Sequence, residues 1–253
     1  MSEKERQGLA SVPAAKRILC IDVGASGLKA AVISPRGKYL VRRVRVKTPK
    51  RRKPTDIVKA LTGLVAPLAP FDHVTIGFPG MVRDGKVMTA PNLGTEDWRG
   101  FDLSGALRKR FARPVKLLND ADVQGLAVIQ GRGLELVCTL GTGLGTAWFR
   151  DGELMPHMDL AHLVMHKKDD FDLYIGDKTR RKIGNRHWNR RVRKLIGVLE
   201  TVFAYDHLYL GGGNSRCVDF KLPRNVSLVS NDAGMEGGAF AWSKFAAKSR
   251  AKS

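Results

Sequence analysis

A glycine-rich turn between two apolar runs is the first part of the sequence that could carry chemistry. Residues 138–148 read CTLGTGLGTAW, with Gly141, Gly143 and Gly145 at alternate positions. A dinucleotide-binding loop needs the spacing G-x-G-x-x-G between a strand and a helix. Here the spacing is G-x-G-x-G, and the TAWFR that follows is typical of a strand. The backbone N–H groups and the Thr142 hydroxyl of such a turn can instead bind phosphate oxygens.

A second turn of this kind lies near the start of the chain, in IDVGASGLK at residues 21–29. Asp22 ends a strand pattern, Gly24 allows close approach of the backbone, and Ser26 and Lys29 can face a phosphate. Because phosphate repels a carboxylate, Asp22 implies a Mg²⁺ ion that it holds directly or through water. Either turn alone is more often an ordinary β-hairpin. Together, in matching positions, they predict a clamp around a phosphate chain.

The elements that position these turns repeat along the chain. Each half begins with a strand, a glycine-rich turn, a strand, a turn and a strand, which predicts two similar α/β lobes. Apolar residues at helical spacing predict a helix that begins with Thr55 as its N-cap, and a second helix from Trp188 to Phe203. The other expected elements are strands at 73–78, 114–120, 207–211 and 225–230 and helices at 103–112, 120–131 and 234–248.

The composition indicates a globular protein with an unusual charge. Of its 253 residues, 44 are Lys or Arg and 24 are Asp or Glu, which gives a formal net charge of +20. Much of the excess lies in two clusters, at 42–53 and 178–194. Such an excess favours polyanionic partners, although two solvated basic faces would produce the same composition.

The chain shows no apolar run of the about 18–20 residues that a membrane helix needs, and its first residues resemble no secretory signal. We therefore expect no membrane partner and a cytoplasmic location. The three cysteines lie far apart in apolar segments, which predicts buried free thiols in a reducing compartment. They are too few for a four-cysteine zinc site.

Several motifs together resemble those of the ROK family of sugar kinases. In the family's order, the chain contains D-x-G-A-S-G-x-K, G-F-P-G-M-V, L-N-D-A-D, L-G-T-G-L-G-T, His162 and G-G-G-N-S. The resemblance covers residues 18–242 and is greatest to the polyphosphate glucokinase branch. It implies the two-lobed actin-like ATPase (ribonuclease H-like) fold, an α/β fold with mixed sheets, helices on both faces and an active site in the interlobe cleft.

We expect four parts of the chain: a flexible arm at 1–16, an N-terminal lobe at 17–118, a C-terminal lobe at 119–233, and a final helix with a basic tail at 234–253. The resemblance also implies a homodimer, Mg²⁺, and ATP or inorganic polyphosphate as the phosphoryl donor.

Position by position, the resemblance assigns roles to single residues. Asp120 in LNDAD corresponds to the catalytic base, which takes the proton of the sugar 6-hydroxyl as that oxygen attacks the terminal phosphoryl group. Asn119 would bind the sugar, and it can also cap the helix that follows. Asp122 is a rival carboxylate, but two positions along a helix turn it by about 200°. Gly80 would line the sugar site, and a loop of three glycines would lie near the adenosine: Gly211, Gly212 and Gly213.

The sugar pocket departs from the family pattern. Where the family has G-E-x-G-H, this chain has MDLAH, so that Asp159 replaces the glutamate and Ala161 a glycine, while His162 is retained. The aspartate reaches about one methylene less far. A further glutamate expected downstream is missing, and either Asp170 or Asp172 could replace it. The zinc-binding C-x-C-G-x-x-G-C segment of many ROK members is absent. Weaker matches to family loops lie at Asn92, Trp98 and 231–234.

The leading hypothesis is a kinase that transfers a phosphoryl group from polyphosphate or ATP to glucose or a related hexose. The alternative is a non-catalytic ROK regulator that binds sugar or nucleotide. ROK repressors carry an N-terminal helix-turn-helix domain, for which the sixteen polar residues before the first strand are too few. Nucleic acid is an unlikely partner, because aromatic residues are sparse and, apart from Trp188, do not interleave with the basic clusters. The sequence identifies neither the sugar nor the donor.

Overall fold

Two five-stranded mixed sheets with the same order of connections form the framework of the computed structural model, which describes residues 16–166, 168–230 and 234–242. The first sheet has the order β3-β2-β1-β4-β7, and the second has the order β10-β9-β8-β13-β14. In each sheet the three strands at one edge are antiparallel and the others run parallel. The predicted repeat of a three-stranded meander is therefore confirmed.

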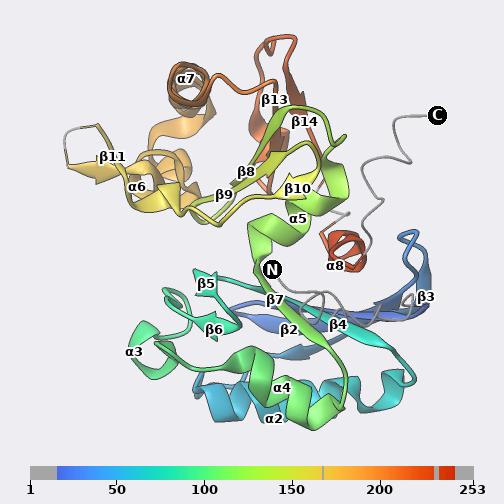
Figure 1. Cartoon of the computed structure of the whole chain (residues 1–253). Helices are drawn as coiled ribbons and strands as arrows, with labels where there is room; N and C mark the ends of the chain where they lie inside the picture. The colour runs from blue at the N-terminus through green and yellow to red at the C-terminus, as the bar shows by residue number, and fades with distance from the viewer. Residues whose placement is uncertain (1–15, 167, 231–233, 243–253) are drawn as a thin grey trace, which may run out of the picture.

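The first sheet consists of β1 (Ile18–Val23), β2 (Gly27–Ile33), β3 (Tyr39–Lys47), β4 (His73–Phe78) and β7 (Val115–Asn119). Residues of β1 alternate between its two faces, as the two-residue period of a strand requires. Leu19 and Ile21 pack in the core with α2 (Pro54–Val65) and α4 (Leu103–Phe111), whereas Ile18 and Cys20 pack against α8 (Glu236–Phe240). Asp22 continues the second series, so its side chain is on the face turned toward the other lobe (Figure 1).

Helix α2 starts at a different cap from the one expected. Lys53 is the N-cap and Pro54 the first helical residue, so Thr55 lies inside the helix. Proline suits this position because its fixed φ matches the helix and its missing N–H would have had no partner there. The apolar stripe of the helix, at Ile57, Leu61 and Leu64, is buried as predicted. The short helix Ala66–Leu68 continues it in a tighter turn.

The second sheet contains β8 (Leu134–Leu140), β9 (Leu144–Arg150), β10 (Glu153–Leu154), β13 (His207–Gly211) and β14 (Val226–Leu228). Helix α7 (Asp177–Phe203) packs on one face through Trp188, Val192 and Leu195. Helix α7 is longer than expected and is interrupted at Gly184, whose φ of 76° is not helical. Val202, which the pattern placed on the apolar face, is exposed.

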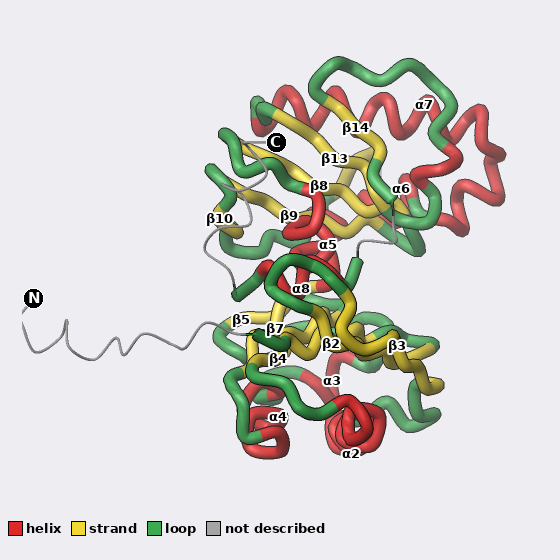
Figure 2. Tube along the Cα trace, turned by 90° about the vertical axis from the view of Figure 1, so that its right-hand side faces the viewer, coloured by secondary structure: helices red, strands yellow, loops and turns green. Residues whose placement is uncertain are grey.

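Helix α5 (Asp120–Val128) lies between the two sheets, next to α8 (Figure 2). Its residue Ala121 and its C-cap Ile129 pack against the second sheet, while Val123 approaches Gly77 of the first. Gly237 of α8 lies so close to the carbonyl oxygen of Val123 that a side chain would not fit there. Both sheets therefore have helices on both faces, as predicted.

The smaller elements are the hairpin β5 (Val82–Arg83) and β6 (Lys86–Val87), helices α3 (Thr95–Trp98) and α6 (Phe171–Ile175), the pair β11 (Val164–His166) and β12 (Asp169–Asp170), and single 3₁₀ turns at Leu160–His162 and Ser215–Cys217. Of these, α6, β11 and β12 were not predicted.

The lobe boundaries stay predictions. Helix α5 begins next to the expected boundary at 118/119. The arm at 1–16 lies outside the described residues except for Lys16, as do residues 231–233 and 243–253, which include the end of the predicted final helix and its basic tail. Of the three cysteines, all free, Cys20 and Cys138 are buried as predicted, but Cys217 is partly exposed. Among the described helices, none is long and apolar enough to cross a membrane.

Candidate active site

A cleft of about 850 Å³ separates the two lobes, and both lobes line it. Fifteen of the residues selected from the sequence line this cleft: Asp22, Gly24, Ser26, Lys29, Gly80, Asn119, Asp120, Gly141, Thr142, Gly143, Gly145, Asp159, His162, Gly212 and Gly213. Gly211 is the exception. It ends strand β13, is buried, and faces Val229 instead of the cleft. Residues from motifs that are far apart in the sequence therefore line the same cleft.

The turn between β1 and β2 forms the first wall of the cleft. Asp22 and Lys29 are direct partners in the antiparallel pair, and Lys29 Nζ donates to Asp22 Oδ2 over 2.7 Å. Both side chains are about one-third exposed. The turn itself closes with a hydrogen bond from Gly24 N–H to the carbonyl of Gly27, 3.1 Å long. This arrangement places one negative and one positive side chain beside a compact turn.

Asp22 is also the residue expected to hold Mg²⁺. Lys29 bonds one carboxylate oxygen, Oδ2, and no other hydrogen bond to this carboxylate is found among the described residues. The described residues contain no cluster of three or more His, Cys, Asp or Glu side chains that could enclose a metal. This donor set fits Mg²⁺, which keeps several waters and commonly uses one or two carboxylates plus substrate phosphates.

The turn between β8 and β9 forms the opposite wall, and Asp172 fixes its shape. Leu144 N–H donates to Asp172 Oδ1 over 2.7 Å. A Cβ at Gly143 would collide with this carboxylate, so the glycine is needed for the close approach. Thr139 lines the cleft and is the last residue but one of β8, the place that Asp22 has in β1 of the other lobe.

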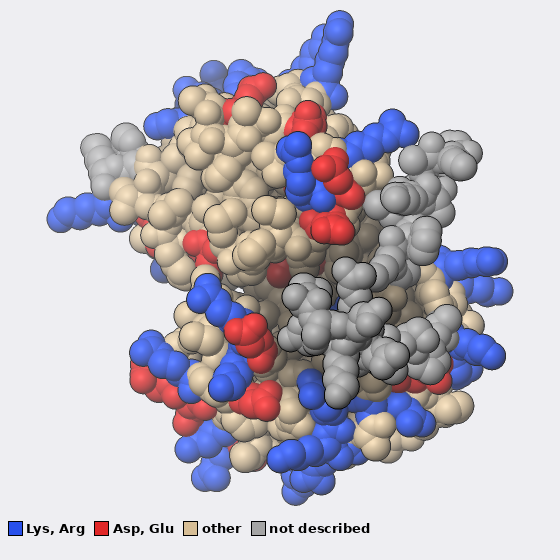
Figure 3. Space-filling model, viewed as in Figure 1, with Lys and Arg blue, Asp and Glu red and all other residues tan. Residues whose placement is uncertain are grey.

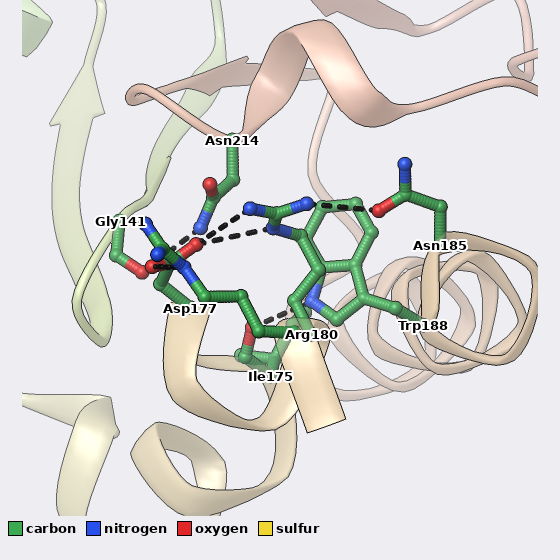
Figure 4. A network of polar contacts seen from close by, with 8 residues as sticks. Gly141, Ile175, Asp177, Arg180, Asn185, Trp188 and Asn214 are labelled. Atoms are coloured by element: carbon green, nitrogen blue, oxygen red, sulfur yellow. Dashed lines mark hydrogen bonds and ion pairs between the residues drawn. The ribbon is translucent and has the colours of Figure 1, made fainter. Parts of the chain in front are cut away.

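A network of polar contacts supports the same turn from behind (Figure 4). The carbonyl oxygen of Gly141 accepts from the N–H of Asp177 over 2.9 Å and from Asn214 Nδ2 over 3.1 Å. Arg180 Nη2 donates to Asp177 Oδ1 over 2.8 Å, and hydrogen bonds from Arg180 lower the pKa of Asp177. Trp188 Nε1 donates to the carbonyl of Ile175 over 2.7 Å. The start of α7 is thereby anchored to the turn.

Asp120, the predicted base, is the first residue of α5. Asn119 is the N-cap, as expected: its Oδ1 accepts from the N–H of Ala121 over 2.8 Å, and its Nδ2 donates to the carbonyl of Gly80 over 3.0 Å. Asn119 therefore ties α5 to the turn at Gly80, and its amide keeps one N–H for another partner.

The surroundings of Asp120 favour its protonated form more than water does. Burial raises the pKa of this carboxyl from 3.8 to about 6, and the charges of Asp22 and Asp122 act in the same direction. The hydrogen bond from the N–H of Ala121 opposes the shift. A carboxylate with a pKa near the working pH is suited to accept a proton during a reaction.

Asp159 and His162 lie on the C-terminal lobe's side of the cleft. Asp159 caps the short 3₁₀ turn by accepting from the N–H of Ala161 over 3.2 Å, and its other oxygen is 3.6 Å from His162 Nε2. The side chain of His162 is 59% exposed, so it is accessible to a molecule in the cleft.

The structure distinguishes the two aspartates that the sequence left open. Asp170 is the N-cap of α6, accepting from the N–H of Leu173 over 2.7 Å. Asp172 lines the cleft, where burial raises its pKa. Asn92 also lines the cleft, whereas Trp98 is fully buried and donates to the carbonyl of Arg52 over 2.8 Å.

Among the cleft-lining residues that sequence reasoning missed are His157, Tyr39 and Arg43. His157 lies in the loop after β10, and its partner Asp122 is 35 positions away, so no local spacing marks the pair. Tyr39 and Arg43 belong to the edge strand β3, which has no buried residue. Only Val41 and Val44 of this strand are partly buried, so its pattern did not show which residues face the cleft.

The order of these motifs matches a known family over more than half of the chain. The family model described as the ROK family matches residues 18–162. The chain belongs to the ROK family. Among curated ROK-type relatives, the chain is 28% identical over 239 residues to the polyphosphate glucokinase of Mycobacterium leprae (strain TN), covering 87% of this chain and 73% of that protein.

Solved structures agree with this placement. The chain resembles the inorganic polyphosphate/ATP-glucomannokinase of Arthrobacter sp. strain KM with a TM-score of 0.79 and 30% identity, covering 89% of this chain and 98% of that one. A ROK glucokinase from Streptomyces griseus, solved with glucose and AMPPNP, has a TM-score of 0.73 at 19% identity, covering 88% and 98%. These similarities confirm the predicted two-lobed actin-like fold.

Proposed function

We propose that this ROK protein is a sugar kinase that transfers a phosphoryl group from polyphosphate or ATP to the 6-hydroxyl of glucose or a related hexose. The observation that carries the proposal is the position of Asp120, a carboxylate with a raised pKa in a cleft that also contains two glycine-rich turns. The similarity to polyphosphate glucokinases and to the glucomannokinase supports a hexokinase-type phosphotransferase.

Each of several cleft residues has its own role in the proposed reaction. Asp120 accepts the proton as the sugar oxygen forms a bond to the terminal phosphorus, and the bond from that phosphorus to the rest of the donor breaks. The N–H groups of Thr142 and Gly143, the Thr142 hydroxyl and Lys29 bind the donor's phosphate oxygens, while the N–H of Gly141 closes the turn by donating to the carbonyl of Gly143 over 3.0 Å. Asn119 holds the attacking hydroxyl in line. Mg²⁺ held by Asp22 would neutralise charge on the phosphates. Phosphoryl transfer depends mostly on such positioning and charge stabilisation.

The basic edge of the N-terminal lobe supports polyphosphate as a donor. Arg42, Arg43, Arg45 and Lys47 are exposed along β3, and Arg43 also lines the cleft. Lys and Arg side chains project from the edge of the molecule where β3 lies (Figure 3). A long polyanion gains from such a row because each phosphate contact releases counterions, whereas the three phosphates of ATP can make fewer such contacts.

The test is a coupled assay of the purified protein with a panel of hexoses, each supplied with Mg²⁺ and either polyphosphate or ATP. We expect turnover with glucose or a close relative, and a steeper loss of rate with rising salt for polyphosphate than for ATP. The absence of turnover with every pair, together with measurable sugar or nucleotide binding, would favour the non-catalytic regulator. Light scattering would measure the expected homodimer. The cytoplasmic location stays a prediction.

A further inference from the structure

The side chains of His157 and Asp122 form a buried pair at the edge of the cleft. His157 Nδ1 lies 3.0 Å from Asp122 Oδ1, and the two side chains are only 7% and 3% exposed. Asp122 belongs to α5, two positions after the proposed base, whereas His157 belongs to the loop that follows β10. The pair therefore joins the helix that carries Asp120 to the loop that carries Asp159.

The contact with Asp122 orients the imidazole ring. A carboxylate accepts hydrogen bonds, so Nδ1 carries the hydrogen in this pair. Nε2 is then the polar ring atom available to a molecule in the cleft, which His157 lines. A hydrogen-bonded carboxylate is the usual means of fixing the orientation of a functional histidine.

Three carboxylates influence the protonation of the ring. Burial alone lowers the pKa of His157, but the hydrogen bond and charge of Asp122 and the charges of Asp159 and Asp120 outweigh it, so the pKa is raised. A protonated ring carries a hydrogen on both nitrogens and can donate from Nε2 to a neutral oxygen. His157 lines the same cleft as Asp120 and Asp159.

We propose that His157 binds the acceptor sugar, donating a hydrogen bond from Nε2 to a sugar oxygen other than the hydroxyl that is phosphorylated, and so helps select the sugar. This inference rests on the proposed function, because Asp120 must engage the attacked hydroxyl. Asp122 is the positioning residue of the pair. The Asp122 carboxylate fixes the orientation of the His157 ring. The Asp122 side chain is only 3% exposed, so it does not contact the sugar itself.

The central variant is H157N. The Asn side-chain amide can donate to Asp122 as Nδ1 does, but it has no atom where Nε2 stood. A hydrogen bond from a charged donor contributes an amount that corresponds to a change of about 10-fold or more in affinity. We expect KM and Kd for the sugar to rise about 10-fold, while KM for polyphosphate stays within about twofold and the melting temperature is little changed.

Two further variants make the test specific. H157Q can place an amide N–H near the former Nε2 while giving up the bond to Asp122, so it should recover part of the sugar affinity. H187N makes the same substitution at an exposed histidine on α7 and should leave all constants unchanged. Calorimetry with each hexose would show whether the order of preference among sugars shifts in H157N.

An H157N variant with the wild-type sugar KM and Kd would overturn the inference. So would an equal rise in the sugar and polyphosphate constants with a lower melting temperature, since that result means that the pair only supports the fold. If the wild type phosphorylates no sugar, the proposed kinase function fails instead. Sugar binding by wild type and H157N, measured by calorimetry without a donor, then still decides whether His157 contacts the sugar.

Discussion

Replacing Asp120 by asparagine should abolish turnover and at the same time stabilise the folded protein. The pKa of Asp120 rises from 3.8 to about 6 in the folded chain, chiefly through burial. One pKa unit corresponds to about 1.36 kcal/mol, so the ionised carboxylate costs the fold up to about 3 kcal/mol at neutral pH. Because the folded pKa is the higher one, stability falls as pH rises from about 4 to 6 and the full cost is present above pH 6.

The uncharged amide of D120N removes this cost and keeps an oxygen that can accept from the N–H of Ala121. At about 2 °C per kcal/mol for a chain of this size, the melting temperature at pH 7.5 should rise by up to about 6 °C. Turnover should fall by about 10²–10⁴-fold, the usual contribution of a general base. Thermal denaturation without Mg²⁺ and a coupled assay would measure the two effects.

D219N, at an exposed aspartate, provides the matched control for loss of one negative charge. Its melting temperature and rate should both stay near those of the wild type. A D120N variant that melts at or below the wild-type temperature would refute the argument from burial. Turnover within about tenfold of the wild type would refute the assignment of the base.

Four other predictions follow from the same geometry. In the pH profile of kcat/KM, activity should fall below about pH 6 as Asp120 takes up a proton, and a profile that stays flat to pH 5 would contradict this. G143A should raise the donor KM and lower the free energy of unfolding by about 1–3 kcal/mol, because the new Cβ displaces the Asp172 carboxylate. G141A is the control: its Cβ meets nothing within 4 Å, so its melting temperature should equal that of the wild type. D22N should raise the Mg²⁺ concentration needed for half-maximal rate without changing the sugar Kd by calorimetry; an unchanged Mg²⁺ dependence would exclude Asp22 as a ligand. W188F should lower the free energy of unfolding, measured with urea, by about 1–3 kcal/mol, because the buried carbonyl of Ile175 loses its hydrogen-bond donor.

The parts of the fold that could be predicted are those set by neighbouring residues. The β1–β2 and β8–β9 turns combine apolar alternation with glycine, so their strands could be predicted from local pattern, and both turns line the cleft. Asn119 was expected as a helix cap because it follows an apolar strand pattern and precedes a helical one. Such signals need no knowledge of distant partners.

What the sequence could not predict depends on pairs that are distant along the chain. The importance of His157 can be recognised only from its contact with Asp122, and that of Asp172 only from its close approach to Gly143. Asp170 and Asp172 look equivalent in sequence, yet one caps a helix and the other enters the cleft. Gly211 looked equivalent to Gly212 and Gly213, but it is the last residue of β13 and faces Val229 instead of the cleft.

The tight crossing of α5 and α8 has a consequence for motion. The chain passes from one lobe to the other where β7 ends at Asn119 and α5 begins. Gly237 leaves no space between α8 and Val123 there, so the helices cannot slide freely past each other. A rotation about this junction would widen or narrow the cleft and would move Asp120, which lies beside the junction, least. The glycine-rich turns that we propose to bind the donor would move more.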